Sequence, residues 1–211
     1  MSDLILHHYP TSPFAEKIRL VLGHKQLAWK SVFIPMVMPK PELTALTGGY
    51  RKTPVLQIGA DVYCDTALIC DVLEHIAPTP SLYPAGVEGN ARIVAQWADS
   101  ALFTAAMAYN FQPAGVAQVF AGAPAEGVQA FVADRTAMRS GAARMSPAEA
   151  TPTYQSYLRH LASMLQGQDF LLGAQASLAD FAAYHPLWFT QERTPALAGI
   201  FDATPEVKSW M

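Results

Sequence analysis

Cysteine is scarce in this chain of 211 residues, which contains only Cys64 and Cys70. Two cysteines so close together cannot form the disulfide framework of a small secreted protein, and their spacing matches no common metal site. The six histidines form no recognisable ligand set, because His7 and His8 are neighbours on an expected strand and point to opposite faces. The composition therefore predicts no metal and favours a reducing, cytoplasmic environment.

Blocks of like charge and long apolar runs are also missing. The net charge is -3, with 14 basic and 17 acidic residues spread along the chain, which argues against binding to nucleic acid. No apolar stretch is long enough to span a membrane, and the N-terminus lacks the charged start and apolar core of a signal peptide. Hydrophobic residues make up 51% of the chain, enough for one large domain or two modest ones.

The first part of the chain combines strand and helix signals. Short strands are expected at residues 4–6, 31–34, 55–58 and 61–64. Gly59-Ala60 predicts a hairpin between the last two, because glycine suits the first position of a type II′ turn. Helices are expected from Pro13 and over residues 65–76, where apolar residues recur at helical spacing. The proline-rich stretch from Pro35 to Pro41 is expected to form a loop.

Beyond residue 77 the sequence changes character. Prolines and glycines at residues 78–90 predict a linker, and the remainder is rich in alanine and helical in pattern. Helices are expected over residues 90–111, about 128–144, and along an apolar stripe from Tyr154 to Leu165, with a loop at 112–127. Pro147 and Pro152 are expected to break the pattern. The sequence therefore predicts an α/β domain at 1–77 and an all-helical domain at 91–211.

The C-terminal part contains two further signals. Ser177 and Asp180 form a capping box, with Asp in place of the usual Glu, and we expect it to start a buried helix and take no part in chemistry. Residues 205–211 resemble the opening of an amphipathic helix at which the sequence stops. Whether the native chain continues past Met211 is left open.

Ser12 is the strongest candidate for chemistry. It precedes Pro13, which suits the first turn of a helix, so Ser12 falls at the helix N-cap. A hydroxyl there lies among free backbone N–H groups at the positive end of the helix dipole, a place that can hold an anion or a thiolate. Taken alone, the segment favours a simple capping role for Ser12, because serine is a preferred N-cap residue.

Two further pairs of residues suit a ligand. Pro54 stands at the start of a strand after Thr53, and a cis bond there would turn the Thr53 backbone toward an extended peptide, although trans is the expected state from sequence alone. Asp65 and Thr66 open a helix. They cap it, or Thr66 and the helix N–H groups hold a ligand carboxylate while Asp65 holds an ammonium group, as a glutamyl end would require.

Together these features resemble the cytosolic glutathione transferases over essentially the whole chain. That family joins a thioredoxin-like domain to an all-helical domain, with a linker where residues 77–90 lie. Thr53-Pro54 matches its cis-proline position, Asp65-Thr66 its pair for the γ-glutamyl end of glutathione, and Ser177 to Asp180 its helix-capping signature. The resemblance implies glutathione as co-substrate, no metal, a homodimer, and a cytoplasmic location.

Within the family, residues 12–16 are most similar to the omega-class motif Cys-Pro-Phe-Ala-Glu, and Lys40-Pro41-Glu42 also resembles that class. Ser12 stands where an omega enzyme has its catalytic Cys, so disulfide exchange is not expected and serine-type chemistry is. The resemblance also implies contacts with glutathione from these residues: Phe14, Lys40, Lys52, Thr53, Pro54, Asp65 and Thr66.

The expected function is conjugation of glutathione to a small hydrophobic electrophile. The Ser12 hydroxyl would donate a hydrogen bond to the sulfur and stabilise its thiolate, with Tyr9 as the alternative donor. The alternatives are a glutathione-dependent isomerase or dehalogenase, and a non-enzymatic glutathione-binding protein. Met107 and Phe111 could pack in the core or, with Trp188, line the electrophile pocket. No motif identifies the electrophile.

Overall fold

The computed structural model describes residues 3–138, 141 and 145–211, and its internal contacts divide the chain into two units. The first unit comprises residues 1–81 and 123–142, and the second comprises residues 82–122 and 143–211. The segment 123–142 lies in the region that the sequence assigns to the helical domain, yet it makes its contacts with the N-terminal residues. None of the described helices has the length and apolar character needed to cross a bilayer.

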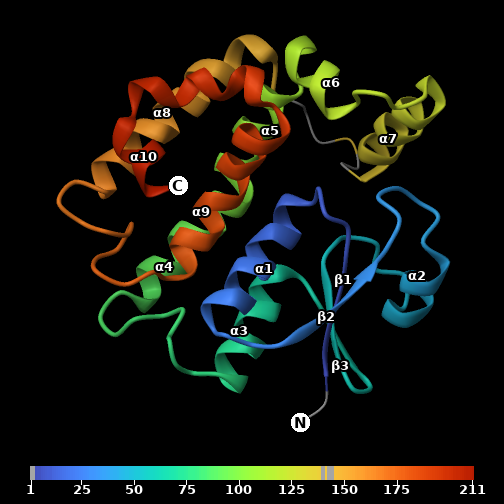
Figure 1. Cartoon of the computed structure of the whole chain (residues 1–211), viewed down its shortest axis with the longest axis horizontal. Coiled ribbons are helices and arrows are strands. Elements are labelled where there is room, and N and C mark those ends of the chain that lie inside the picture. The colour runs from blue at the N-terminus through green and yellow to red at the C-terminus, as the bar shows by residue number, and fades with distance from the viewer. Residues whose placement is uncertain (1–2, 139–140, 142–144) are drawn as a thin grey trace. The chain divides into compact units, whose positions relative to one another are not determined.

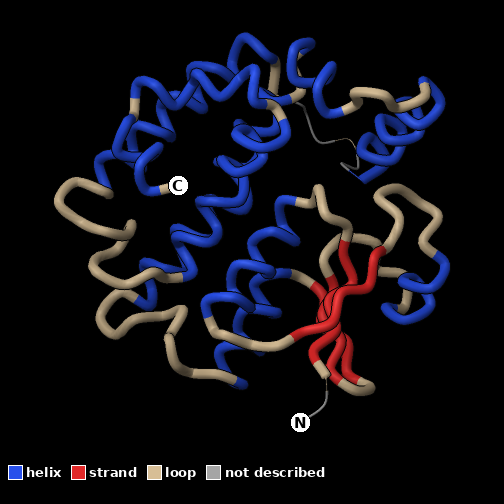
Figure 2. The backbone as a smooth tube through the Cα atoms, viewed as in Figure 1, coloured by secondary structure: helices blue, strands red, loops and turns tan. Residues whose placement is uncertain are grey.

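A four-stranded sheet organises the first unit (Figures 1 and 2). The strand order is β2-β1-β3-β4, with β1 parallel to β2 and antiparallel to β3, and with β3 antiparallel to β4. Gly59 has a φ of 62° in the two-residue turn between β3 and β4, as the hairpin prediction requires. The strands are β1 (Leu4–His8), β2 (Trp29–Phe33), β3 (Val55–Ile58) and β4 (Asp61–Cys64).

Helices cover both faces of this sheet. Figure 1 shows α1 (Pro13–His24) and α3 (Thr66–Ile76) on one face and α2 (Pro41–Thr47) beyond the other. Leu4, Leu6 and His8 are buried because alternate residues of β1 point to the same face. The element order βαβαββα confirms a thioredoxin-like domain. A further helix, α7 (Ala125–Met138), belongs to the same unit.

The second unit is all-helical, which confirms the second half of the predicted fold. The expected helix at 90–111 is present as α4 and α5 joined by a π-helical turn, η1. The capping box is also present, since Asp180 accepts hydrogen bonds from the backbone N–H and the hydroxyl of Ser177, each at 2.9 Å. The elements are α4 (Glu88–Trp97), η1 (Ala98–Leu102), α5 (Phe103–Asn110), α6 (Pro113–Val119), α8 (Pro147–Met164), α9 (Leu178–Trp188), η2 (Phe189–Arg193), η3 (Pro195–Ala203) and α10 (Pro205–Trp210).

Two of the expectations based on proline were wrong, at α6 and α8. The loop expected at 112–127 contains α6. The loop expected from Pro35 to Pro41 is present up to residue 40, and α2 begins at Pro41. In α6 and α2 proline occupies the first turn, where its missing N–H is not needed. Helix α8 continues through Pro152, because burial of Tyr154, Leu158 and neighbouring apolar residues outweighs one lost hydrogen bond. Helix α7 runs from Ala125 to Met138, and most of the remaining predicted span to residue 144 lies outside the described residues.

His8 gives the first unit a predicted pH dependence. Its Nδ1 accepts from Arg19 at 3.1 Å and its Nε2 donates to Ser31 at 2.7 Å, so the ring is held neutral. Burial, together with the Arg19 charge, lowers the pKa of His8 to about 4. The unfolded chain binds this proton near pH 6.5, whereas the folded chain does not. The contribution of neutral His8 to the free energy of unfolding is therefore complete above pH 6.5 and is lost as the pH falls toward 4.

We therefore expect the free energy of unfolding to fall by about 1 to 2 kcal/mol between pH 7 and pH 5 on account of His8. Urea denaturation across this pH range measures the slope. His8→Gln cannot titrate, so its slope should be shallower than that of the wild type. Equal slopes in the two proteins would rule out His8 as the source.

Candidate functional site

Ser12 lies at the N-terminus of α1, where the sequence places it. Its Oγ accepts a hydrogen bond from the Ala15 N–H at 3.2 Å, and its own N–H donates to the Tyr9 carbonyl at 3.1 Å. The residue is only 2% exposed. Ser12 therefore caps α1, and in this cap its hydroxyl acts only as an acceptor. Among the described residues, no acceptor is found for the Ser12 hydroxyl proton, which leaves that proton to donate to a ligand.

Tyr9 lies next to Ser12 between two cationic side chains. The Lys40 Nζ is 5.6 Å from the centre of the Tyr9 ring, and the Arg135 Nη2 donates to the Tyr9 hydroxyl at 3.2 Å. This bond also uses the hydroxyl as an acceptor, so Tyr9 keeps a proton to donate. Both predicted thiol donors, Ser12 and Tyr9, thus have the chemistry for that role.

Lys40 and Thr53, two of the predicted glutathione contacts, lie side by side. The Lys40 Nζ donates to the Thr53 hydroxyl at 3.2 Å and to the Arg51 carbonyl at 3.3 Å. Lys40 is 4% exposed, and its burial, together with the neighbouring Arg135 and Arg51, lowers its pKa to about 8 against the opposing effect of Asp134. The Lys40 ammonium group therefore loses its proton more readily than that of an ordinary lysine, and a nearby anion would stabilise its charged form.

The Thr53-Pro54 bond is cis, the state that the resemblance implied and that the base rate for proline disfavoured. Pro54 is buried at the start of β3. Lys52 is exposed, with no hydrogen bond to the described part of the chain. Phe14 is half-buried in the first turn of α1. These residues share the end of the sheet from which α1 departs, since β1 runs antiparallel to β3.

Asp65 and Thr66 begin α3 directly after β4. Asp65 is exposed, its carboxylate accepts from the Ala67 N–H at 2.8 Å, and its φ of 79° is one that non-glycine residues rarely adopt. Such backbone strain clusters at ligand sites. The buried Thr66 hydroxyl accepts from the Lys17 Nζ at 3.3 Å. Lys17 thus places a cation beside the expected carboxylate position, which the sequence analysis missed although Lys17 lies in the α1 segment.

A second set of residues escaped the sequence analysis altogether. Asp134 of α7 is nearly buried, and its carboxylate accepts from the Met38 N–H at 3.0 Å and pairs with Arg51 and Arg135. Hydrogen bonds and charge pairing hold the pKa of Asp134 below its usual range, against the effect of burial. Only the sequence separation of 83 and 96 residues hid this cluster, because no local pattern connects α7 to residues 38 and 51.

The residues expected to line an electrophile pocket all lie in the second unit. Phe111 stacks on Phe189 at 6.1 Å between ring centres and lies 6.4 Å from Phe120. Met107 and Trp188 are half-buried in α5 and α9. The aromatic packing of Phe111 fits the core interpretation, and a pocket formed by the three residues remains a prediction.

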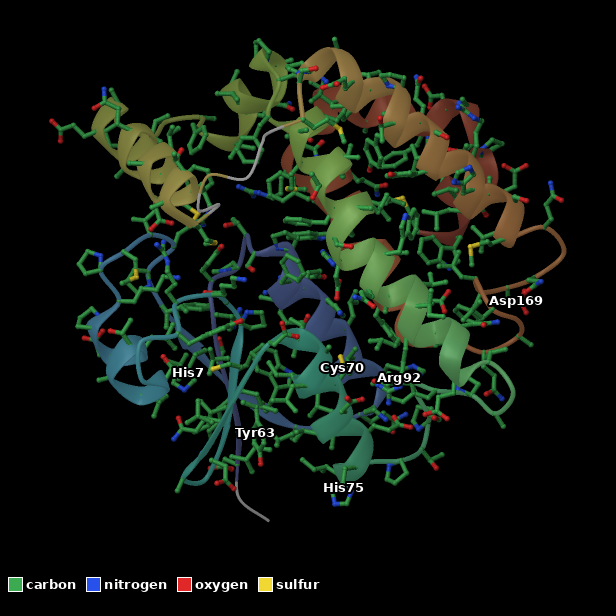
Figure 3. The ribbon with its side chains drawn as sticks, turned by 180° about the vertical axis from the view of Figure 1, so that it is seen from behind. His7, Tyr63, Cys70, His75, Arg92 and Asp169 are labelled. Carbon is green, nitrogen blue, oxygen red and sulfur yellow. The ribbon has the colours of Figure 1, made fainter. Side chains whose placement is uncertain are left out.

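Among the residues that the structure describes, the thiols and the possible metal ligands form no site of their own. Cys64 and Cys70 form no disulfide; Cys70 is buried in α3 (Figure 3), and burial together with Asp65 raises the pKa of the Cys64 thiol. His7 and His8 make contacts to different partners, as expected for opposite faces of β1, and the His7 Nε2 lies 2.9 Å from the Gln57 Oε1. In the described part of the chain, no group of three His, Cys, Asp or Glu residues could hold a metal ion.

Comparison with known proteins agrees with this architecture. The N-terminal domain model of the glutathione S-transferases matches residues 6–81, and the corresponding C-terminal domain model matches residues 135–211. A GST-like protein from Pseudomonas syringae, known from its crystal structure, is 47% identical over 100% of this chain, with a TM-score of 0.74. This chain spans 66% of that protein's length.

Two curated relatives are more distant. The FtsZ-localized protein A of Caulobacter vibrioides is 27% identical over 185 residues, which is 84% of this chain and 73% of that protein. The pyrimidodiazepine synthase of Drosophila melanogaster is 36% identical over 76 residues, or 34% of this chain and 31% of that protein. With both domain models matched in order on a thioredoxin-like unit and a helical unit, the chain belongs to the glutathione S-transferase family.

Proposed function

We propose that this protein is a glutathione transferase that conjugates glutathione to a small hydrophobic electrophile. One observation supports this most directly: the Ser12 hydroxyl at the N-terminus of α1 is used as an acceptor and retains its proton. A thiolate placed there would accept that hydrogen bond and would also face the positive end of the α1 dipole. Both interactions favour the ionised form of the thiol and lower its pKa.

The rest of glutathione has matching partners in the same unit. The γ-glutamyl end carries a carboxylate and an ammonium group, which suit the N-terminus of α3 beside Lys17 and the exposed Asp65 carboxylate. The extended peptide suits the backbone of Thr53, just before β3. The glycyl carboxylate suits Lys40, which is buried and surrounded by cations. These assignments place the sulfur toward Ser12 and Tyr9.

The chemical step then follows from the thiolate. Its sulfur attacks an electrophilic carbon, the C–S bond forms, and the leaving group departs with the electrons of the broken bond. Ser12 stabilises the charge before the attack and forms no covalent bond. Because Ser12 has no sulfur, no mixed disulfide with glutathione can form at this position. A homodimer and a cytoplasmic location belong to the same proposal.

The second candidate is a glutathione-binding protein that acts through a protein partner. The Caulobacter relative favours it, since the name FtsZ-localized protein A states a partner and no reaction. Ser12 also satisfies this candidate, because an N-cap alone explains its contact to Ala15. A glutathione-dependent isomerase or dehalogenase is a third candidate on the same site.

Calorimetry followed by product analysis separates these candidates. We expect glutathione to bind and to be consumed stoichiometrically with a chloronitrobenzene electrophile, giving the thioether conjugate. Binding without any product would support the partner-binding candidate, and recovery of free glutathione after turnover would support isomerisation. Absence of glutathione binding at millimolar concentration would contradict the transferase proposal.

A further inference from the structure

Lys40, Arg51, Asp134 and Arg135 form a cluster, here called the α7 cluster. It carries more positive charge than the Asp134 carboxylate neutralises. Arg51 and Arg135 both pair with Asp134, and Lys40 lies close enough to feel the charges of all three. Both carboxylate oxygens of Asp134 are engaged, one by the Met38 N–H and Arg51, the other by Arg135. Among the described residues of the cluster, three cations thus share one anion, which leaves two positive charges in excess at neutral pH.

The hydrogen bonds of the cluster show the same excess. The Nε–H of Arg51 is buried, and it has no hydrogen-bond partner in the described structure. The Arg135 Nη2 donates to two neutral acceptors, the Tyr9 hydroxyl and the Met36 carbonyl, each at 3.2 Å. Cationic donors pair most strongly with anionic acceptors, so neutral partners leave much of this capacity unused.

The cluster is also open to a ligand. The side chains of Arg51 and Arg135 are 28% and 22% exposed, whereas the side chain of Asp134 is 6% exposed. Arg51 and Arg135 are therefore partly exposed to solvent, whereas Lys40 and the shared Asp134 carboxylate are buried. Tyr9 connects this surface to the thiol position, because its hydroxyl contacts Arg135 and its carbonyl accepts from the Ser12 N–H.

We propose that Arg135, supported by Arg51, determines specificity for electrophiles that carry a carboxylate or a similar anionic group. The inference rests on the proposed function, in which the glycyl carboxylate of glutathione neutralises one of the two excess charges at Lys40. One positive charge then remains beside Tyr9, next to the position of the reacting sulfur. An anionic group on the second substrate satisfies it, and a neutral electrophile leaves it unpaired.

A matched pair of glutathione conjugates tests the charge preference without requiring turnover. S-(2,4-dinitrophenyl)glutathione and S-(4-carboxy-2-nitrophenyl)glutathione differ only in a nitro group and a carboxylate at the same ring position. Calorimetry on the wild type should show that the carboxylate conjugate binds about tenfold more tightly, as expected for one hydrogen bond to a charged group. Arg135→Gln should remove most of this preference, and Arg135→Lys should retain part of it.

The controls separate this site from the glutathione site and from a general charge effect. Lys30→Gln removes one positive charge from an exposed position on β2 and should leave the preference unchanged. S-methylglutathione lacks the ring, so its affinity should be nearly the same in Arg135→Gln and the wild type. In the wild type itself, the preference should shrink at high salt, a measurement that holds even if Arg135→Gln does not fold.

Three results would overturn the inference: equal affinity of the wild type for both conjugates, a preference that survives Arg135→Gln, or an equal loss of S-methylglutathione binding in that variant. The last result would assign the charge to glutathione itself. A clear preference without catalytic turnover would contradict the transferase proposal and leave the anion site in place. Turnover without any preference would support the transferase proposal and contradict the anion site.

Discussion

Ser12→Ala should raise the pKa of the glutathione thiol in the bound state by about two units, or about 2.7 kcal/mol of lost thiolate stabilisation. The alanine side chain cannot donate the hydrogen bond that the free Ser12 proton offers. At neutral pH we expect kcat/KM to fall by about 100-fold, the lower end of the loss for one oxyanion-type donor. Ultraviolet absorbance of the bound thiolate across pH measures the pKa directly.

A matched control is needed because Ser12→Ala also removes a helix cap, at a cost of about 1 kcal/mol of stability. Ser146 caps α8 in the same way, with its Oγ accepting from the Glu149 N–H at 3.3 Å. Ser146→Ala should therefore lose similar stability and keep the thiol pKa and the activity. The comparison separates a catalytic loss from destabilisation.

Tyr9→Phe completes the test of the thiol donor. If Ser12 is the donor, Tyr9→Phe should leave the thiol pKa within a few tenths of a unit, although loss of the Arg135 contact could alter substrate affinity. A raised pKa in Tyr9→Phe together with an unchanged pKa in Ser12→Ala would transfer the role to Tyr9. An unchanged pKa in both variants would contradict the proposed mechanism.

Gly115→Ala should cause the largest loss of stability in the second unit, about 3 kcal/mol or more. A Cβ at Gly115 would lie 1.9 Å from the Asn110 carbonyl oxygen and 2.9 Å from the Leu197 Cδ1. The first of these atoms belongs to the backbone at the end of α5, so a side-chain rotation cannot relieve the clash. Helix α6 would have to move away from α5.

That movement would also disturb a buried polar network. The Asn110 side chain donates to the Thr190 hydroxyl and accepts from the Thr194 hydroxyl, each at 2.9 Å, and the Tyr154 hydroxyl lies 3.0 Å from the Thr190 hydroxyl. Each of these groups is buried, so a broken bond leaves an unsatisfied polar atom and adds to the loss. The clash and the disturbed network therefore both lower the stability of Gly115→Ala.

Thermal and urea denaturation of Gly115→Ala measure this effect. Gly89→Ala is the matched control in the same unit, because a Cβ at Gly89 meets no atom within 4 Å and the residue lies in α4. It should be neutral or should stabilise the protein by up to about 1 kcal/mol. Similar stabilities for the two variants would show that α6 does not pack closely against α5.

Features that depend on neighbouring residues could be predicted from the sequence alone. The β3–β4 hairpin follows from Gly59, the start of α1 follows from Ser12 and Pro13, and the capping box follows from the spacing of Ser177 and Asp180. A turn, a cap or an amphipathic repeat is decided within a few residues, and a sequence pattern can show it. The order of these signals also predicted both domains of the family.

Features that depend on distant contacts are set by the folded chain, and no local pattern shows them. Helix α6 forms where proline and glycine predicted a loop, and α8 continues through Pro152, because packing against other helices outweighs local preference. The cluster of Asp134 with Arg51 and Arg135 belongs to the same class, since it joins residues 83 positions apart. Ser12 and its neighbour Tyr9 illustrate the two cases: the Ser12 cap is local, whereas Lys40 and Arg135 contact Tyr9 only because the chain folds.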